Sequence, residues 1–283
     1  MKLRSIIAIT ALLSFLSLSV ESRAYQEIEV TNGGTIQGKA ILTGKMPPPR
    51  VYHLILFPNI DMCAEIDVDD EMNRVLDDFQ ISEDNGLKDV VITLEHVEAG
   101  KPFNKEPILI NSEQCKFSPD VSVVRQGEGF KVDNVDAVMH NSQVYQKERG
   151  KIIQNLPIPP EAVTVGTVQF QGKYKIFQMI CGMHEFMQTW GYRIQNPYYV
   201  KTKRGGEFKI DNIPPGDYVL SAWHFLMKPQ TRKIHIAENG SVDVNFEFDG
   251  NKVIRPLYET IKSGRIKKDA ATPGTAKGKE VGK

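Results

Sequence analysis

Hydrophobic and polar residues alternate along this chain in many short stretches, each bounded by turn-forming residues. A period of two is typical of half-buried β-strands, and turn pairs such as Asn85-Gly86 and Asn239-Gly240 separate the stretches. Many short strands at this spacing favour an all-β class built from sandwiches or barrels. The predicted strands are Thr35–Leu42, Val90–Leu94, Val121–Val124, Gly129–Val132, Val165–Phe170, Lys173–Ile180, Glu207–Ile210, Tyr218–Trp223, Thr231–Ile236 and Ser241–Phe248.

Helical patterns occupy only two places, Val253–Ile261 and Asp69–Asp78. Residues 263–283 are mostly Lys, Gly, Ala, Thr and Pro, which cannot bury a core, so residues 249–283 are predicted to be a short helix and a disordered basic tail. A boundary near Trp190–Pro197 divides the rest into a first β-unit over residues 25–190 and a second over 191–248.

The N-terminus has the layout of a secretory signal peptide. Lys2 and Arg4 precede the apolar run Ile6–Val20, and small residues end the segment at Ala24. A run of about 15 residues is short for a membrane span, although an uncleaved anchor is the alternative. We therefore expect cleavage after residue 24, a periplasmic or secreted protein, and no stable membrane insertion afterwards.

Composition excludes several classes. Charged residues are 25% and hydrophobic residues 41% of the 283, which argues against global disorder and against a multi-span membrane protein. Lys and Arg number 35, as do Asp and Glu, so no global field indicates nucleic-acid binding. An acidic stretch at residues 61–84 and the basic tail are interpreted as solvated surface.

The chemistry concentrates in one short run. Cys181, His184 and Met187 fall within seven residues, and His140 lies about forty residues upstream. One thiolate, two imidazoles and a weak thioether form the trigonal site that suits copper cycling between two oxidation states. This cluster predicts a metal site at the strand ends of a sandwich.

The spacing Cys181-x2-His184-x2-Met187, with His140-Asn141 before it, resembles the type 1 copper site of cupredoxins, and the ligand loop is closest to amicyanin. The resemblance implies a Greek-key β-sandwich, equatorial ligands His140, Cys181 and His184, and an axial Met187. It also implies that Asn141 ties the ligand loops together by hydrogen bonds. Glu185 stands where the family has a proline beside the second histidine.

Two alternatives stay open for this cluster. Cys181 could be a buried free thiol with His184 an ordinary surface histidine, although an unpaired thiol in an oxidising compartment is a liability. Zinc would accept a cysteine and two histidines, but it prefers a hard fourth ligand or water to methionine. The softness of the thiolate and thioether ligands and the Irving–Williams order favour one copper ion over zinc at this site.

Two cysteines remain once Cys181 is assigned to the metal. An even pair of cysteines in a protein expected to reach an oxidising compartment predicts a disulfide between Cys63 and Cys115. Neither belongs to a Cys-x2-Cys pair, so a thioredoxin-like role is not expected.

The second unit carries its own motifs: Gly206-Glu207-Phe208 and Pro214-Pro215-Gly216-Asp217-Tyr218. These resemble the carboxypeptidase regulatory-like, or transthyretin-like, β-sandwich module. Residues 33–56 resemble the first strands of that module, which leaves open whether the second sandwich is continuous or discontinuous in sequence. The whole resembles secreted bacterial proteins described as methylamine-utilisation or plastocyanin-like.

These observations predict a periplasmic copper protein that transfers single electrons, rather than an enzyme. No nucleophile triad, phosphate loop or dinucleotide motif is present in the sequence. By the resemblance, Met183, Phe186 and Trp190 would form an apolar docking rim around an exposed His184 edge, for a c-type cytochrome or a dehydrogenase. The alternative is a copper-binding or structural module of the cell envelope without redox turnover.

Overall fold

The computed structural model describes residues 25–103, 108–146, 150–170, 172 and 174–254. Strands dominate these residues, and the helices among them are the 3-10 turn η1 (Leu54–Leu56) and α1 (Ile60–Cys63). The predicted all-β class is confirmed. The expected signal peptide, the basic tail and most of the expected helix 253–261 lie outside the described residues. Within the described part, no helix has the length and apolar character needed to cross a membrane.

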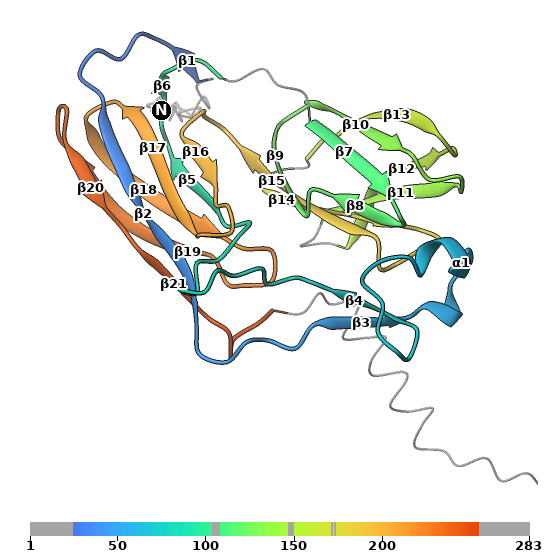
Figure 1. Ribbon diagram of the computed structural model, residues 1–283. Helices are drawn as coiled ribbons and strands as arrows, with labels where there is room; N and C mark the ends of the chain where they lie inside the picture. The colour runs from blue at the N-terminus through green and yellow to red at the C-terminus, as the bar shows by residue number, and fades with distance from the viewer. Residues whose placement is uncertain (1–24, 104–107, 147–149, 171, 173, 255–283) are drawn as a thin grey trace, which may run out of the picture.

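Two sheets form what we call the site sandwich, which Figure 1 shows in green and yellow. One sheet has the order β13-β10-β7-β8 and the other β12-β11-β14-β15-β9. Side chains such as Phe130 from the first sheet and Met179 from the second share one buried core, so the sheets pack face to face. The strands are β7 (Ile108–Glu113), β8 (Lys116–Ser118), β9 (Val121–Arg125), β10 (Gly129–Asn134), β11 (His140–Gln146), β12 (Lys151–Ile158), β13 (Ala162–Thr167), β14 (Ile176–Cys181) and β15 (Gln188–Ile194).

Strands from both ends of the described chain form the companion sandwich, on the opposite side of the molecule in Figure 1. Its sheets have the orders β16-β5-β18-β19 and β17-β2-β20, and β21 also pairs with β2. The strands are β2 (Gly34–Thr43), β5 (Val91–Glu95), β16 (Tyr199–Lys201), β17 (Glu207–Ile213), β18 (Gly216–Trp223), β19 (Gln230–Ile236), β20 (Ser241–Asp243) and β21 (Phe246–Asp249). A further pair, β1 (Gln26–Glu27) with β6 (Ala99–Gly100), lies beside it.

The expected domain boundary needs correction. β5 lies within the span assigned to the first unit, yet it pairs with β18 of the C-terminal part. β2 lies in the segment 33–56 that resembles the second module, and it pairs with β17 of that module. β15 runs through residue 190 without a break. Trp190, Tyr192 and Ile194 on β15 pack into the core of the companion sandwich. β15 thus belongs to a sheet of the site sandwich while three of its alternate side chains enter the companion core, which places the boundary inside a strand rather than in a linker.

A small subdomain covers one end of the site sandwich; we call residues 50–76 the cap. It comprises β3 (Arg50–His53), η1, α1 and β4 (Asn73–Leu76), and β3 pairs with β4. A disulfide between Cys63 in α1 and Cys115 beside β8 fastens the cap, which confirms the predicted pairing. The helix expected at residues 69–78 is wrong, because β4 occupies that segment and pairs with β3.

Candidate metal centre

Two neighbouring strands bring the candidate ligands together. β11 begins at His140 and β14 ends at Cys181, and the two strands are antiparallel with Ser142 opposite Cys181. The ladder continues one step past the strand end, where the Gly182 N–H donates to the Asn141 carbonyl at 2.9 Å. Because this register fixes both strand ends, His140 and Cys181 meet although 41 residues separate them.

The loop from Cys181 to Met187 returns the third candidate to the same point. The Cys181 N–H donates to the Met187 carbonyl at 3.0 Å, and the Met187 N–H donates to the His184 carbonyl at 2.8 Å. Gly182 packs against the Gln143 side chain, whose amide nitrogen would lie 2.7 Å from a Cβ at this position. Main-chain bonds across the base of the loop therefore hold His184 above Cys181.

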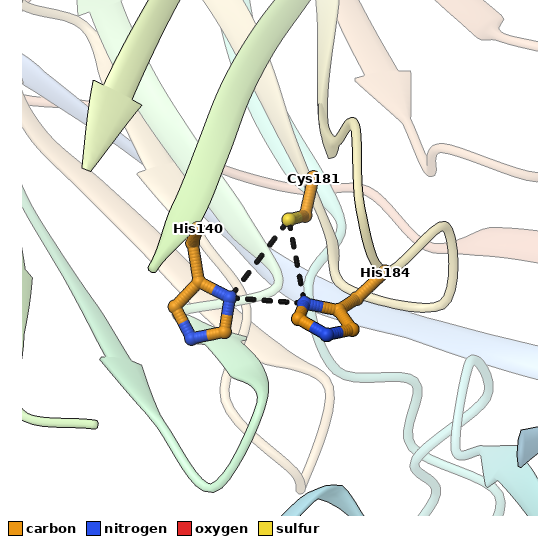
Figure 2. Close-up of side chains that lie close together, drawn as sticks. All are labelled: His140, Cys181 and His184. Carbon is orange, nitrogen blue, oxygen red and sulfur yellow. Dashed lines mark hydrogen bonds between the residues drawn. The ribbon is translucent and has the colours of Figure 1, made fainter. Parts of the chain in front are cut away.

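Three atoms converge at this point, as Figure 2 shows. The Nδ1 atoms of His140 and His184 lie 3.1 Å apart, and Cys181 Sγ lies 3.8 Å and 3.6 Å from them respectively. All three side chains are completely buried. The predicted set of two imidazoles and one thiol is thus assembled in space.

The triangle has the dimensions of a metal site. The circle through its three corners has a radius of about 2.0 Å, close to the roughly 2.0–2.1 Å for nitrogen and 2.3 Å for sulfur that zinc, another first-row ion, takes. Each of the three residues offers a soft or borderline donor, and no carboxylate oxygen is among the three facing atoms. The donor chemistry therefore fits a copper ion better than a hard cation.

The sulfur of Cys181 is surrounded by hydrogen-bond donors. The Asn141 N–H donates to Sγ at 3.4 Å. Burial raises the pKa of the thiol, but hydrogen bonds from His140 and His184 and from the N–H groups of Asn141 and Met183 outweigh it and lower the pKa below its ordinary value. The site therefore favours the thiolate, which is the metal-binding form.

His140 has a buried acidic partner that the sequence did not single out. Its Nε2 lies 2.8 Å from Oδ2 of Asp136, which is 5% exposed. Burial lowers the pKa of His140, but hydrogen bonds with Asp136 and Cys181 outweigh this and raise it. Asp136 was visible four residues before His140, but its role depends on a fold that turns the two side chains together.

His184 departs from the expectation of an exposed ligand edge. Its side chain is fully buried, and its Nε2 has no hydrogen-bond partner among the described residues. The His184 ring contacts Phe186 at 5.7 Å between centroids, and Phe57 of the cap packs on Phe186 at 5.1 Å. The guanidinium carbon of Arg74, also of the cap, lies over the Phe186 ring, 5.0 Å from its centroid.

The expected docking rim is therefore wrong for two of its three residues. Phe186 and Trp190 are buried, and only Met183 reaches the surface, with 37% of its area exposed. The resemblance to cupredoxins implied that all three surround a solvent-exposed His184, whereas the cap covers the loop from Cys181 to Met187. The cap could not be foreseen from the ligand loop, since its residues lie more than a hundred positions before Cys181.

Two further predictions have mixed outcomes. Asn141 does tie the ligand strands together, but through its main-chain N–H and carbonyl, while its side-chain oxygen has no partner among the described residues. Met187 closes the loop with its backbone, and its side chain lies in the same buried cluster as Cys181. Its role as an axial ligand stays a prediction.

Comparison with known proteins gave matches only among solved structures. No family model matches the chain, and no curated protein matches it. Among the solved structures are a Cu-containing nitrite reductase (NirK) from Thermus scotoductus SA-01, a purple cupredoxin from Nitrosopumilus maritimus and amicyanin from Paracoccus versutus.

These likenesses are partial. The nitrite reductase is 15% identical at a TM-score of 0.28, and the match covers 34% of this chain and 24% of that one. The purple cupredoxin is 19% identical at a TM-score of 0.26, and the match covers 31% of this chain and 99% of that one. Amicyanin is 16% identical at a TM-score of 0.27, and the match covers 36% of this chain and 97% of that one. The chain thus spans about a quarter of the length of the nitrite reductase.

Proposed function

We propose that this protein binds one copper ion through His140, Cys181 and His184 and transfers single electrons. The observation that carries the proposal is the buried triangle of two Nδ1 atoms and one thiolate sulfur, with edges of 3.1, 3.6 and 3.8 Å. When bound, copper would supply a one-electron couple. The protein's own part is to fix the three donors and to exclude water from them.

Burial of the donors suits this role. Strands β11 and β14 hold His140 and Cys181, and main-chain bonds hold the loop of His184, so the cage resists rearrangement when the metal changes its oxidation state. The centre is nevertheless close to the surface. Met139 and Met183, which directly precede the two histidines, are 47% and 37% exposed.

The test is to load the purified protein with one equivalent of Cu(II) and record its visible spectrum and metal content. We expect an intense thiolate-to-copper absorption that Cys181→Ser abolishes and Met187→Gln retains with a shifted potential. His235→Ala is the control for His184→Ala, because the His235 side chain is 69% exposed and pairs with Asp217 in the companion sandwich. A colourless, redox-silent copper complex, or selective zinc binding, would refute the proposal.

One observation favours a second function, copper held without turnover in the cell envelope. His184 is completely buried and its loop is covered by the cap, so no described ligand edge faces a partner. Electron exchange with a c-type cytochrome separates the two functions. Rapid exchange supports the electron carrier, and its absence in a blue, reducible protein supports storage or a structural role.

A further inference from the structure

The loop before β11 positions a carboxylate behind the candidate ligand His140. Asn134 folds this loop, since its side-chain amide donates to the carbonyls of Val138 at 3.0 Å and Pro159 at 2.8 Å. Its side-chain oxygen accepts the Asp136 N–H at 3.2 Å. Asp136 is thereby fixed with its carboxylate turned inward, 5% exposed.

A tight turn on the other sheet receives this carboxylate. Glu113 pairs with Lys116, so Gln114 and Cys115 form a two-residue turn between β7 and β8. Both have positive φ, 51° and 54°, a left-handed conformation that is uncommon for non-glycine residues. Consecutive residues in this conformation point their N–H groups to the same side and form an anion-binding concavity.

The two N–H groups of that turn donate hydrogen bonds to the Asp136 carboxylate. The Gln114 N–H donates to Oδ1 at 2.6 Å and the Cys115 N–H donates to Oδ2 at 3.0 Å. The same Oδ2 accepts from His140 Nε2 at 2.8 Å. Both oxygens of the buried group thus accept hydrogen bonds from N–H donors, as a carboxylate does.

The two candidate imidazole ligands therefore differ on their far sides. His140 Nε2 has an anionic partner, whereas His184 Nε2 has no partner among the described residues. A carboxylate on the remote nitrogen fixes the tautomer of a ligand histidine and makes its other nitrogen a stronger donor. It also adds negative charge near the ion, which favours the higher oxidation state.

We propose that Asp136 is a positioning residue that orients His140 through its Nε2–H and biases the bound copper toward Cu(II). The proposal depends on the function proposed above. It requires that the hydrogen bond exist without metal and that the negative charge, more than the side-chain shape, set the balance between the two oxidation states.

The redox test compares Asp136→Asn with Glu113→Gln. Both remove one negative charge, but Glu113 is exposed beside the same turn and has no contact with His140. We expect Asp136→Asn to lower the ratio of Cu(II) to Cu(I) affinity about tenfold or more and Glu113→Gln to leave it unchanged. Tenfold corresponds to a rise of about 59 mV in potential. Equal potentials in a blue Asp136→Asn protein would overturn the proposal.

A second measurement needs no variant and no copper. In ¹⁵N NMR of the metal-free wild-type protein, we expect the His140 Nε2 proton to be slowly exchanging and shifted downfield by its carboxylate partner. An unprotonated or rapidly exchanging Nε2 would overturn the proposal even if Asp136→Asn fails to fold. Failure of the proposed function is distinct, because it would appear as a wild-type protein that does not form the blue complex.

Discussion

The disulfide between Cys63 and Cys115 offers a sharp test of how the cap is held. It joins residues 52 positions apart, and both sulfurs are buried. Closing a loop of that length removes conformational entropy from the unfolded chain, which corresponds to about 4 kcal/mol at 25 °C in the chain-entropy description. The double variant Cys63→Ala, Cys115→Ala should lose stability of this order.

The loss should be localised at the cap. β3 and β4 pair only with one another and with short flanking segments, so the disulfide is their covalent tie to the site sandwich. Non-covalent ties persist, including the hydrogen bond from Gln188 Nε2 to the Tyr52 hydroxyl at 2.9 Å. We expect faster amide exchange in residues 50–76 of the double variant and little change in β14.

The assay is urea unfolding with intrinsic fluorescence, combined with hydrogen exchange followed by mass spectrometry. Wild-type protein reduced by dithiothreitol is the matched control, because it lacks the bond but keeps both sulfur atoms, and it should agree with the double variant. Cys115→Ala retains the N–H that donates to Asp136, so copper binding should survive. A loss below about 1 kcal/mol, or unchanged exchange in the cap, would refute the reasoning.

Two other predictions concern a buried histidine and a tightly packed glycine. Burial lowers the pKa of His224 to about 3, so the unfolded chain binds a proton below about pH 6.5 that the folded one does not, and stability should fall by about 2 kcal/mol from pH 7 to pH 5. Urea midpoints at the two pH values should show this loss reduced in His224→Asn; an identical loss would contradict it. Gly191→Ala should cost about 3 kcal/mol or more, because the new Cβ would clash with the Phe177 ring. Gly129→Ala, whose Cβ would meet nothing closer than 3.6 Å, is its control, and equal thermal midpoints would contradict the prediction.

Local pattern was enough to predict the donor set and many of the strands, β2 among them, but not β7, β11, β12 or β15. β2 illustrates the reason, since its buried and less buried positions alternate over much of its length as a period of two requires. The ligand loop was equally readable, because Cys181 and His184 lie three residues apart and need only a strand end and a turn to converge. Cysteine parity gave the disulfide, since one pairing remained once Cys181 was set aside.

Only the tertiary structure decided what covers the site and what stands behind it. His184 is buried by Phe186 and the cap, and His140 is backed by Asp136, whose own anchor is the turn at Gln114. Periodicity specifies which face of a strand is apolar, but it does not specify which distant segment packs on that face. For the same reason β5 could be recognised as a strand from sequence while its pairing with β16 and β18 could not, whereas the resemblance of residues 33–56 to the second module did place β2 there.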